Sequence, residues 1–239
     1  MSRAFEEIDH QSTPIGDISL RRRLEPTLLV DVYEVKLGDE FLMSSLFTAS
    51  EEAVARLGLA ARDGDGLDVI VGGLGLGYTA RTALDDARVK RLQVIETLPQ
   101  VIGWHRDHLV PLGAALTADD RCTFVHGDFF AMVADGIEHG TDGPTRFDAI
   151  LVDIDHTPSH LLSSDHASFY QPAGLARVRD QLLPGGVFAL WSDDPPDTEF
   201  VALLDETFDS VDAHIVAFPN FYTGGESACT VYVCVITGR

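Results

Sequence analysis

The sequence predicts an α/β fold with a mostly parallel, doubly wound sheet, and three observations lead to it. First, the stretch Leu67–Tyr78 runs from four apolar residues directly into Gly72, Gly73, Gly75 and Gly77. An apolar run bounded by glycines is typical of a strand buried on both faces. Second, apolar segments alternate with helix-compatible segments as far as residue 208. Third, the last two apolar segments are separated only by a loop, which indicates an antiparallel hairpin.

The part of the chain before this stretch predicts a small β-rich extension. Residues 1–15 are polar and mixed, so we expect a loosely held arm there. Three short strands follow as an antiparallel meander, at Ile18–Leu24, Leu28–Leu37 and Phe41–Met43. A capping-box pattern from Thr48 to Glu51 then starts a helix. We therefore divide the chain into residues 1–47, the arm and meander, and residues 48–239, the main α/β domain.

The main domain alternates between predicted strands and helices. Strands are expected at Leu67–Val71, Arg91–Ile95, Cys122–Val125, Phe147–Val152, Val187–Trp191, Val211–Phe218 and Thr230–Ile236. Helices are expected at Thr79–Ala87, Pro99–Leu116 with a break near Pro111, Phe129–Ala134, Pro172–Leu183 and Thr198–Phe208. Pro184, Gly185 and Gly186 are expected to stop the fourth helix. Polar loops are predicted at residues 138–145 and 219–227.

Composition narrows the classes of function. The chain has 17 Lys and Arg against 38 Asp and Glu, a net charge of −21. This charge argues against nucleic acid or an anionic membrane as a partner. It is compatible with a cationic small substrate, and an acidic surface also serves solubility. No apolar run approaches the ~20 residues of a membrane span. Three cysteines imply no disulfide framework, and the N-terminus has no secretory pattern, so we expect a cytoplasmic protein.

Glycines or acidic residues follow the predicted parallel strands, and ligands of such sheets bind at the carboxyl ends of the strands. These positions are Gly73–Gly77, Glu96 with Thr97, Gly127 with Asp128, Asp153–His156 and Asp193–Asp197. Glu96 lies 19 residues past Gly77, a distance at which an acid accepts hydrogen bonds from ribose hydroxyls. There is no Gly-Lys-Ser/Thr, which disfavours a P-loop. The spacing of Gly73, Gly75 and Gly77 departs from GxGxxG, which disfavours a dinucleotide dehydrogenase.

Asp153, Asp155 and His156 form the predicted catalytic cluster. A carboxylate beside a transferred group can orient or deprotonate an amine or hydroxyl nucleophile. His156 can act as the general base, since an ordinary histidine has a pKa near ~6.5. In the alternative interpretation, Asp155 and His156 only cap the turn through hydrogen bonds to the backbone.

Five segments carry a resemblance to a known family: GGLGLGYTAR, VIET, HGDFF, FDAILVD and LLPGGVFAL. They resemble the class I S-adenosylmethionine-dependent methyltransferases, and GLGLGYTAR is similar to the GGGDGGTAR segment of the spermidine synthase-like branch. The resemblance covers roughly residues 17–237. It implies a Rossmann-like fold with a seven-stranded sheet and a C-terminal antiparallel hairpin. It also implies a homodimer through the N-terminal strands.

The same resemblance implies roles for individual residues. Gly73, Gly75 and Gly77 would pass close to the amino-acid part of the cofactor. Glu96 would hold the ribose and Asp128 the adenine amino group, and we assign the adjoining Thr97 and Gly127 to the same cofactor site. Asp153 falls on the acidic residue that opens the spermidine synthase active-site loop.

Three departures from aminopropyltransferases concern the parts that recognise a polyamine. Leu76 stands where those enzymes carry an acid, the loop reads DIDHTPSH where theirs reads like DSSDP-GPA, and residues 17–50 lack an LDG-type segment. We therefore expect a methyltransferase that uses S-adenosylmethionine and acts on an N or O nucleophile of a small molecule, and the net charge is compatible with a cationic one. Two alternatives stay open. One is aminopropyl transfer from decarboxylated S-adenosylmethionine to a polyamine, and the other is a cofactor-binding protein without transferase activity.

The acceptor side is predicted from Asp193, Phe221 and Tyr222, which lie after the fifth strand and in the last loop. Asp153 with Asp193 and Asp194 also resembles the metal site of catechol-type O-methyltransferases, which bind Mg²⁺ through oxygen ligands. We favour a capped helix start at Asp193–Asp197 and no metal. Pro158 likewise disfavours a zinc site made by His156 and His160.

Overall fold

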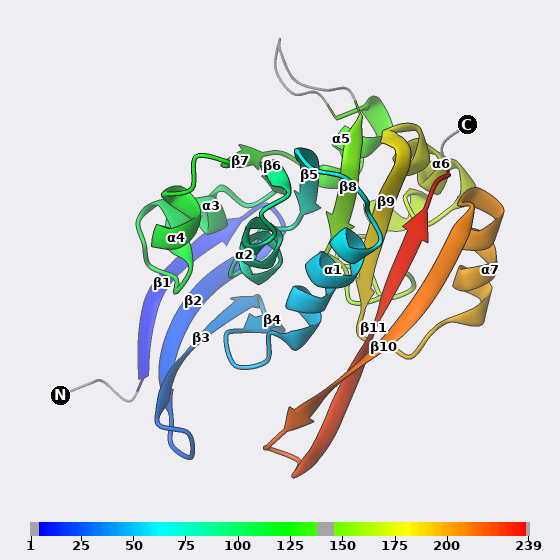
Figure 1. Ribbon diagram of the computed structural model, residues 1–239. Helices are drawn as coiled ribbons and strands as arrows, with labels where there is room; N and C mark the ends of the chain where they lie inside the picture. The colour runs from blue at the N-terminus through cyan, green and yellow to red at the C-terminus, as the bar shows by residue number, and fades with distance from the viewer. Residues whose placement is uncertain (1–4, 138–145, 238–239) are drawn as a thin grey trace.

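The computed structural model describes residues 5–137 and 146–237, which form two β-sheets with helices around the larger one (Figure 1). The first sheet contains β1 (Phe5–Thr13), β2 (Gly16–Glu25), β3 (Val30–Leu37) and β4 (Glu40–Ser44), antiparallel and in that order. Figure 1 shows this sheet in blue, beside the α3 and α4 side of the main domain.

β1 shows that the expectation of a loosely held arm is wrong for residues 5–13. The strand pairs with β2 along its length, and Asp9 Oδ2 accepts a hydrogen bond of 2.6 Å from Trp104 Nε1 in the main domain. The residues of β1 are mostly polar because much of the strand is exposed, so they lack the apolar alternation by which strands are predicted.

The main sheet has the order β10-β11-β9-β8-β5-β6-β7. Its strands are β5 (Leu67–Gly72), β6 (Val89–Glu96), β7 (Cys122–His126), β8 (Phe147–Val152), β9 (Leu182–Ser192), β10 (Ser210–Asn220) and β11 (Gly225–Val235). β5 to β9 are parallel, and β11 is antiparallel to both β9 and β10. The predicted seven-stranded sheet with a C-terminal hairpin is confirmed. The chain order reverses between β5 and β8, the position at which such sheets bind ligands.

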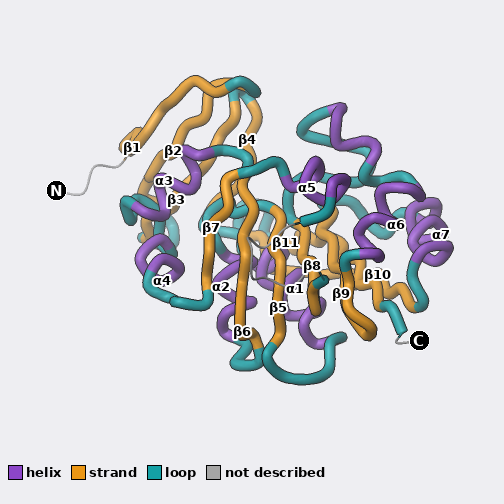
Figure 2. Tube along the Cα trace, turned by 90° about the horizontal axis from the view of Figure 1, so that it is seen from above, coloured by secondary structure: helices purple, strands orange, loops and turns teal. Residues whose placement is uncertain are grey.

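Helices cover both faces of this sheet. One face packs against α1 (Ala49–Ala60), α2 (Tyr78–Asp85), α3 (Pro99–Arg106) and α4 (Gly113–Thr117). The other packs against α5 (Phe129–Asp135), α6 (Pro172–Asp180) and α7 (Thr198–Thr207). A short 3₁₀ helix, Ser164–Ser168, precedes α6. α6 and α7 lie side by side in Figure 2. Val69 and Val71 of β5 face the first layer and Ile70 faces the second, the alternation of a doubly buried strand.

Two predicted boundaries are wrong. α6 ends at Asp180, and Pro184, Gly185 and Gly186 lie within β9 instead of stopping a helix. They form a bulge, because Leu182 pairs with Phe147 and the next pairing joins Val187 to Ala149. The β10–β11 hairpin is longer than expected, since its pairing continues to Asn220 and Gly225. The loop predicted at 219–227 is thereby reduced to residues 221–224, while the loop predicted at 138–145 lies outside the described residues.

No helix in residues 5–137 or 146–237 combines the length and the apolar character needed to cross a membrane.

Candidate functional site

The turn between β5 and α2 contains three glycines in left-handed conformations. The φ angles are +92° at Gly73, +47° at Gly75 and +94° at Gly77. A Cβ atom on Gly73 would lie 2.3 Å from the Asp153 carbonyl oxygen, and one on Gly75 would lie 2.6 Å from the sulfur of Met43 in β4. Only glycine readily adopts these φ angles and also has no Cβ atom to collide at these distances. The turn therefore lies tightly between the end of β8 and the N-terminal sheet.

Glu96 at the end of β6 holds this turn in place. Its Oε2 accepts a hydrogen bond of 3.0 Å from the Leu74 N–H, and its Oε1 accepts one of 2.8 Å from the Leu98 N–H. Burial raises the pKa of Glu96, and these backbone donors oppose that shift. The N–H groups of Gly75 and Thr97 also act on this carboxylate, so four backbone donors surround it. Thr97 follows, and its hydroxyl donates to the Gly127 carbonyl at 3.3 Å.

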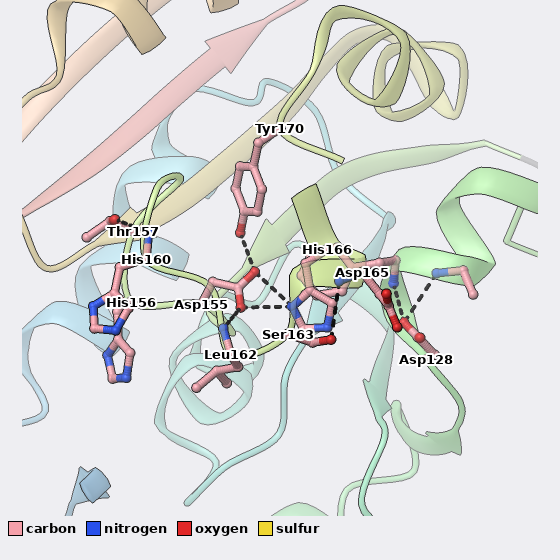
Figure 3. Close-up of polar contacts among 12 residues, drawn as sticks. Asp128, Asp155, His156, Thr157, His160, Leu162, Ser163, Asp165, His166 and Tyr170 are labelled. Atoms are coloured by element: carbon pink, nitrogen blue, oxygen red, sulfur yellow. Dashed lines mark hydrogen bonds and ion pairs between the residues drawn. The ribbon is translucent and has the colours of Figure 1, made fainter. Parts of the chain in front are cut away.

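Asp128, two residues beyond β7, is exposed and caps α5. Its Oδ1 accepts hydrogen bonds from the N–H groups of Phe130 (2.9 Å) and Ala131 (3.2 Å), as Figure 3 shows. Within the described part of the chain, its Oδ2 has no hydrogen bond. The structure thus brings Glu96, Thr97, Gly127 and Asp128 to the ends of two adjacent strands, with Asp128 Oδ2 as an acceptor that has no hydrogen bond among the described residues.

Asp153 follows β8 directly, at the switch point of the sheet. Its Oδ2 lies 3.0 Å from the hydroxyl of Thr79 in α2, and the same hydroxyl is 3.2 Å from the Glu51 carbonyl oxygen. Burial raises the pKa of Asp153 to about 6, and the contact with Thr79 opposes the rise. This carboxyl is therefore a proton acceptor whose pKa lies close to neutrality.

Glu51 of α1 is a second acid in the same place, which the sequence analysis did not assign to the site. Burial and then the charge of Asp153 raise the pKa of Glu51 to about 7, against a hydrogen bond of 2.7 Å from Ser50 Oγ. The predicted capping box does not form, because the Thr48 hydroxyl donates to Glu52. Acids are so common in first helical turns that the sequence pattern could not mark Glu51 as functional.

Asp155 is buried, and its carboxylate is fully occupied by its own loop (Figure 3). It accepts hydrogen bonds from Leu162 N (2.7 Å), His166 Nδ1 (2.8 Å) and the Tyr170 hydroxyl (2.9 Å). The His166 ring in turn stacks on Phe130 of α5, with 4.0 Å between centroids. With these hydrogen bonds, Asp155 holds the segment after β8 in place. The predicted catalytic role of Asp155 stays a prediction.

His156 connects three parts of the molecule. Its Nε2 is 2.9 Å from Glu40 Oε1 in β4, and its carbonyl accepts a hydrogen bond of 2.7 Å from the Asp193 N–H. Asp193 itself is exposed. The segment containing both is therefore bound to the N-terminal sheet on one side and to the end of β9 on the other.

The metal alternative has no support in the geometry. In residues 5–137 and 146–237, no three His, Cys, Asp or Glu side chains lie close enough together to hold a metal ion. Asp197 accepts hydrogen bonds from Glu199 N (2.8 Å) and Phe200 N (3.2 Å) and so caps α7. The interpretation of Asp193–Asp197 as a capped helix start is confirmed.

Phe221 and Tyr222 lie at the tip of the β10–β11 hairpin, against the N-terminal part of the chain. Both rings contact Phe47, at centroid distances of 5.6 Å and 5.8 Å, and the Tyr222 hydroxyl accepts a hydrogen bond of 2.9 Å from Arg23. Figure 1 shows this hairpin in orange and red, extending past the end of the sheet. The predicted contact of Phe221 and Tyr222 with an acceptor stays a prediction.

Trp191 and Cys229 complete the surroundings of the two acids. Trp191 is the penultimate residue of β9 and packs on the core face that also contains Leu151, two residues before Asp153. Burial raises the pKa of the Cys229 thiol to about 11, and the charges of Glu51, Asp193 and Asp153 add to this.

Comparisons with known proteins agree with this architecture. No family model matches the chain. Polyamine aminopropyltransferase 2 of Pseudomonas aeruginosa is 25% identical over 216 residues, 84% of this chain and 58% of that protein. The chain thus spans 58% of the length of this curated relative.

Solved structures match over almost the whole chain. A spermidine synthase in complex with the transition state analogue AdoDATO superposes with a TM-score of 0.75 and 17% identity, over 98% of this chain and 74% of that one. The chain therefore has the fold of the spermidine synthases. The spermidine synthase of Thermotoga maritima gives a TM-score of 0.72 and 17% identity, over 98% of this chain and 73% of that one. Human methyltransferase-like protein 13 in complex with SAH gives a TM-score of 0.55 and 20% identity, over 78% of this chain and 82% of that one.

Proposed function

We propose that the protein transfers an aminopropyl group from decarboxylated S-adenosylmethionine to an amine. The observation that carries this proposal is the pair of partly buried carboxylates, Glu51 and Asp153, at the switch point of the sheet. Each of these acids disfavours the ionisation of the other. An ammonium group bound between them would stabilise their ionised forms. The α-carboxylate of S-adenosylmethionine would add a third negative charge there, whereas the decarboxylated donor and an amine acceptor bring positive ones.

Two further observations support the same choice. The net charge of −21 gives the surface a potential that attracts cationic substrates. The curated relative is named a polyamine aminopropyltransferase, and the structures with the higher TM-scores are spermidine synthases. They favour aminopropyl transfer, the alternative of the sequence analysis, over the methyl transfer that it expected first.

The residues present fit a sulfonium nucleoside. The glycine turn Gly73–Gly77 brings backbone close to the switch point, Glu96 lies beside this turn at the end of β6, and Asp128 Oδ2 can accept from an adenine amino group. When bound, the donor supplies a carbon from which a neutral thioether can depart. The chain's own work is to hold the two reactants together, and well-oriented reactants reach effective molarities of ~10⁵ M or more.

The acceptor amine must lose a proton before its lone pair can react. Asp153 can take that proton, because a base works best when its pKa is near the working pH, and burial brings the pKa of Asp153 to about 6. The Thr79 hydroxyl orients this carboxyl. Glu51 stabilises the positive charge of the amines that approach it. His156 is tied to Glu40 and has the role of holding the loop.

Calorimetric titration with both donors tests the proposal. We expect decarboxylated S-adenosylmethionine to bind at least tenfold more tightly than S-adenosylmethionine. We also expect mass spectrometry to detect aminopropylated product with a diamine acceptor. In the matched variant Glu51→Gln, the ratio of the Kd values for the two donors should move closer to one. Both donors should still bind, because they share the adenosine part. Binding of neither donor would refute transfer altogether.

One observation favours methyl transfer as the second candidate. Leu76 is buried in the glycine turn, only 2% exposed, where aminopropyltransferases carry an acid. A site that had lost this acid would discriminate less against the α-carboxylate of S-adenosylmethionine. Tighter binding of S-adenosylmethionine in the titration would therefore support methyl transfer instead.

A further inference from the structure

A buried histidine lies beneath the glycine turn and takes no part in the proposed transfer chemistry. His105 of α3 is completely buried, and its Nε2 is 2.9 Å from the Gly75 carbonyl oxygen. The ring meets Phe124 of β7 edge-on, with 5.6 Å between centroids. A Cβ atom on Gly77 would lie 2.9 Å from His105 Cε1, so the ring also touches the end of the turn.

These contacts fix the tautomer of His105. A carbonyl oxygen can only accept, so Nε2 must carry the hydrogen and donate it. Nδ1 is buried without a hydrogen-bond partner in the described part of the chain. A second proton on Nδ1 would be a buried donor with no acceptor, which is costly. His105 is therefore neutral, in agreement with the lowering of its pKa by burial.

The bond to Gly75 has a consequence for the residue that follows. In a planar trans peptide, the carbonyl of one residue and the N–H of the next point in opposite directions. Holding the Gly75 carbonyl toward α3 therefore fixes the Leu76 N–H on the other side of the turn. Gly75 has φ +47°, and glycine restricts its own backbone less than any other residue. Without the donor from His105, the Gly75 carbonyl would lose the hydrogen bond that fixes its direction.

We propose that His105 is a positioning residue that holds the Gly75–Leu76 peptide in the orientation that donor binding needs. It acts through the hydrogen bond from Nε2, as a neutral imidazole, and touches neither donor nor acceptor. The inference rests on the proposed function only in taking the ligand of the glycine turn to be the sulfonium donor.

Three variants separate positioning from general destabilisation. His105→Leu removes the N–H donor and keeps an apolar side chain, whereas His105→Gln retains an N–H that can reach the carbonyl. Val101→Ala truncates another buried residue of α3, one helical turn before His105, without removing a hydrogen-bond donor, and serves as the destabilised control. If His105→Leu does not fold, His105→Met, with its adaptable chain, takes its place.

We expect the Kd and KM for the donor to rise about tenfold or more in His105→Leu, with kcat changed less than threefold. His105→Gln should restore affinity to within about threefold of wild type. Val101→Ala should bind the donor normally despite a lower Tm. Wild-type affinity in His105→Leu, or an equal loss in Val101→Ala, would overturn the proposal.

A readout without ligand distinguishes this inference from the proposed function. Amide hydrogen exchange in the unliganded protein should accelerate across residues 72–78 in His105→Leu, relative to Val101→Ala of similar stability. If wild type binds no sulfonium nucleoside, the proposed function fails, and the exchange result still decides whether His105 orders the turn. Unchanged exchange in that segment would refute the positioning role.

Discussion

The hydroxyl of Thr79 lies 3.0 Å from Asp153 Oδ2 and also 3.2 Å from the Glu51 carbonyl oxygen. A hydroxyl has one proton, so it donates to only one of these oxygens at a time. When it donates to the carbonyl, it can accept from a protonated Asp153. When Asp153 is ionised, it can donate to that carboxylate. Thr79 can thus hold the carboxyl of Asp153 in both of its protonation states, as a group that accepts a proton during turnover requires.

Asp153→Asn should abolish proton removal from the acceptor while leaving the donor site intact. We expect kcat to fall by about 10²–10⁴-fold, the usual contribution of a general base. The Kd of the donor should stay within about threefold of wild type by calorimetry. Asp205→Asn, at an exposed acid of α7, is the control. A large loss of donor affinity would instead assign Asp153 to the donor site.

The activity should depend on pH through the two partly buried acids. The pKa of Asp153 is about 6 and that of Glu51 about 7, so kcat/KM should rise as pH increases through this range. The two groups titrate as a coupled pair, so the profile reports the pair. Glu51→Gln removes a neighbouring negative charge and should move the rising limb to lower pH. An unmoved limb would mean that the charge on Glu51 does not affect the reacting base.

The same substitution should change stability in a pH-dependent way. Folding raises the pKa of Glu51 from 4.5 to about 7, so the folded protein binds this proton more tightly than the unfolded chain. The corresponding stabilisation is present below pH 4.5 and is lost as pH rises through about 7. Glu51→Gln should therefore raise Tm at pH 8 by a few degrees, about 2–4 °C per kcal/mol, and leave it nearly unchanged at pH 4.

Gly73→Ala should lower the stability of the fold more than the same substitution at another glycine with a similar φ angle. Gly73 and Gly64 have φ angles of +92° and +96°, but only at Gly73 would the new Cβ meet backbone, 2.3 Å from the Asp153 carbonyl. Gly64→Ala should cost about 1 kcal/mol from the backbone alone. Gly73→Ala should lower Tm further and also weaken donor binding. Equal effects in thermal melts would refute the role of this close approach.

Glu40→Gln should loosen the contact between β4 and the loop after β8. Glu40 and His156 are partly exposed, so we expect at most about 1 kcal/mol of stability to be lost. The larger effect should be on the acceptor, with KM raised several-fold at low salt and the difference from wild type reduced at high salt. A change in donor affinity instead would mean that this ion pair orders the glycine turn.

Much of the main sheet could be predicted because its strands are buried on both faces. Phe147–Val152 is apolar at five of six positions and begins and ends where predicted. β1 could not be predicted in this way, since its hydrogen bonds to β2 and the bond from Trp104 to Asp9 are made by the backbone and by polar side chains. The Pro184–Gly186 bulge was missed because the same residues also end helices.

In the candidate site, too, some residues could be predicted from the sequence and others could not. The left-handed glycines of the turn were predictable, because spacing alone indicates backbone that side chains would obstruct. Glu51 and His105 were not, since their importance comes from elements far apart in sequence: α1 beside β8, and α3 beneath the turn. Asp155 differs again, because the bonds that occupy its carboxylate form only when residues 162–170 fold back on it.

The two tryptophans of the chain occupy different environments. Trp104 is buried in α3, with its indole N–H bonded to Asp9 of β1, whereas Trp191 is the penultimate residue of β9 and interacts with Cys229. Light emitted by the first reports the junction of the two sheets, and light emitted by the second reports the surroundings of Cys229, where the charges of Glu51 and Asp153 act. Trp104→Phe would leave Trp191 as the one tryptophan, close to these two acids. Arrival of a cationic ligand could then be followed in real time without a label.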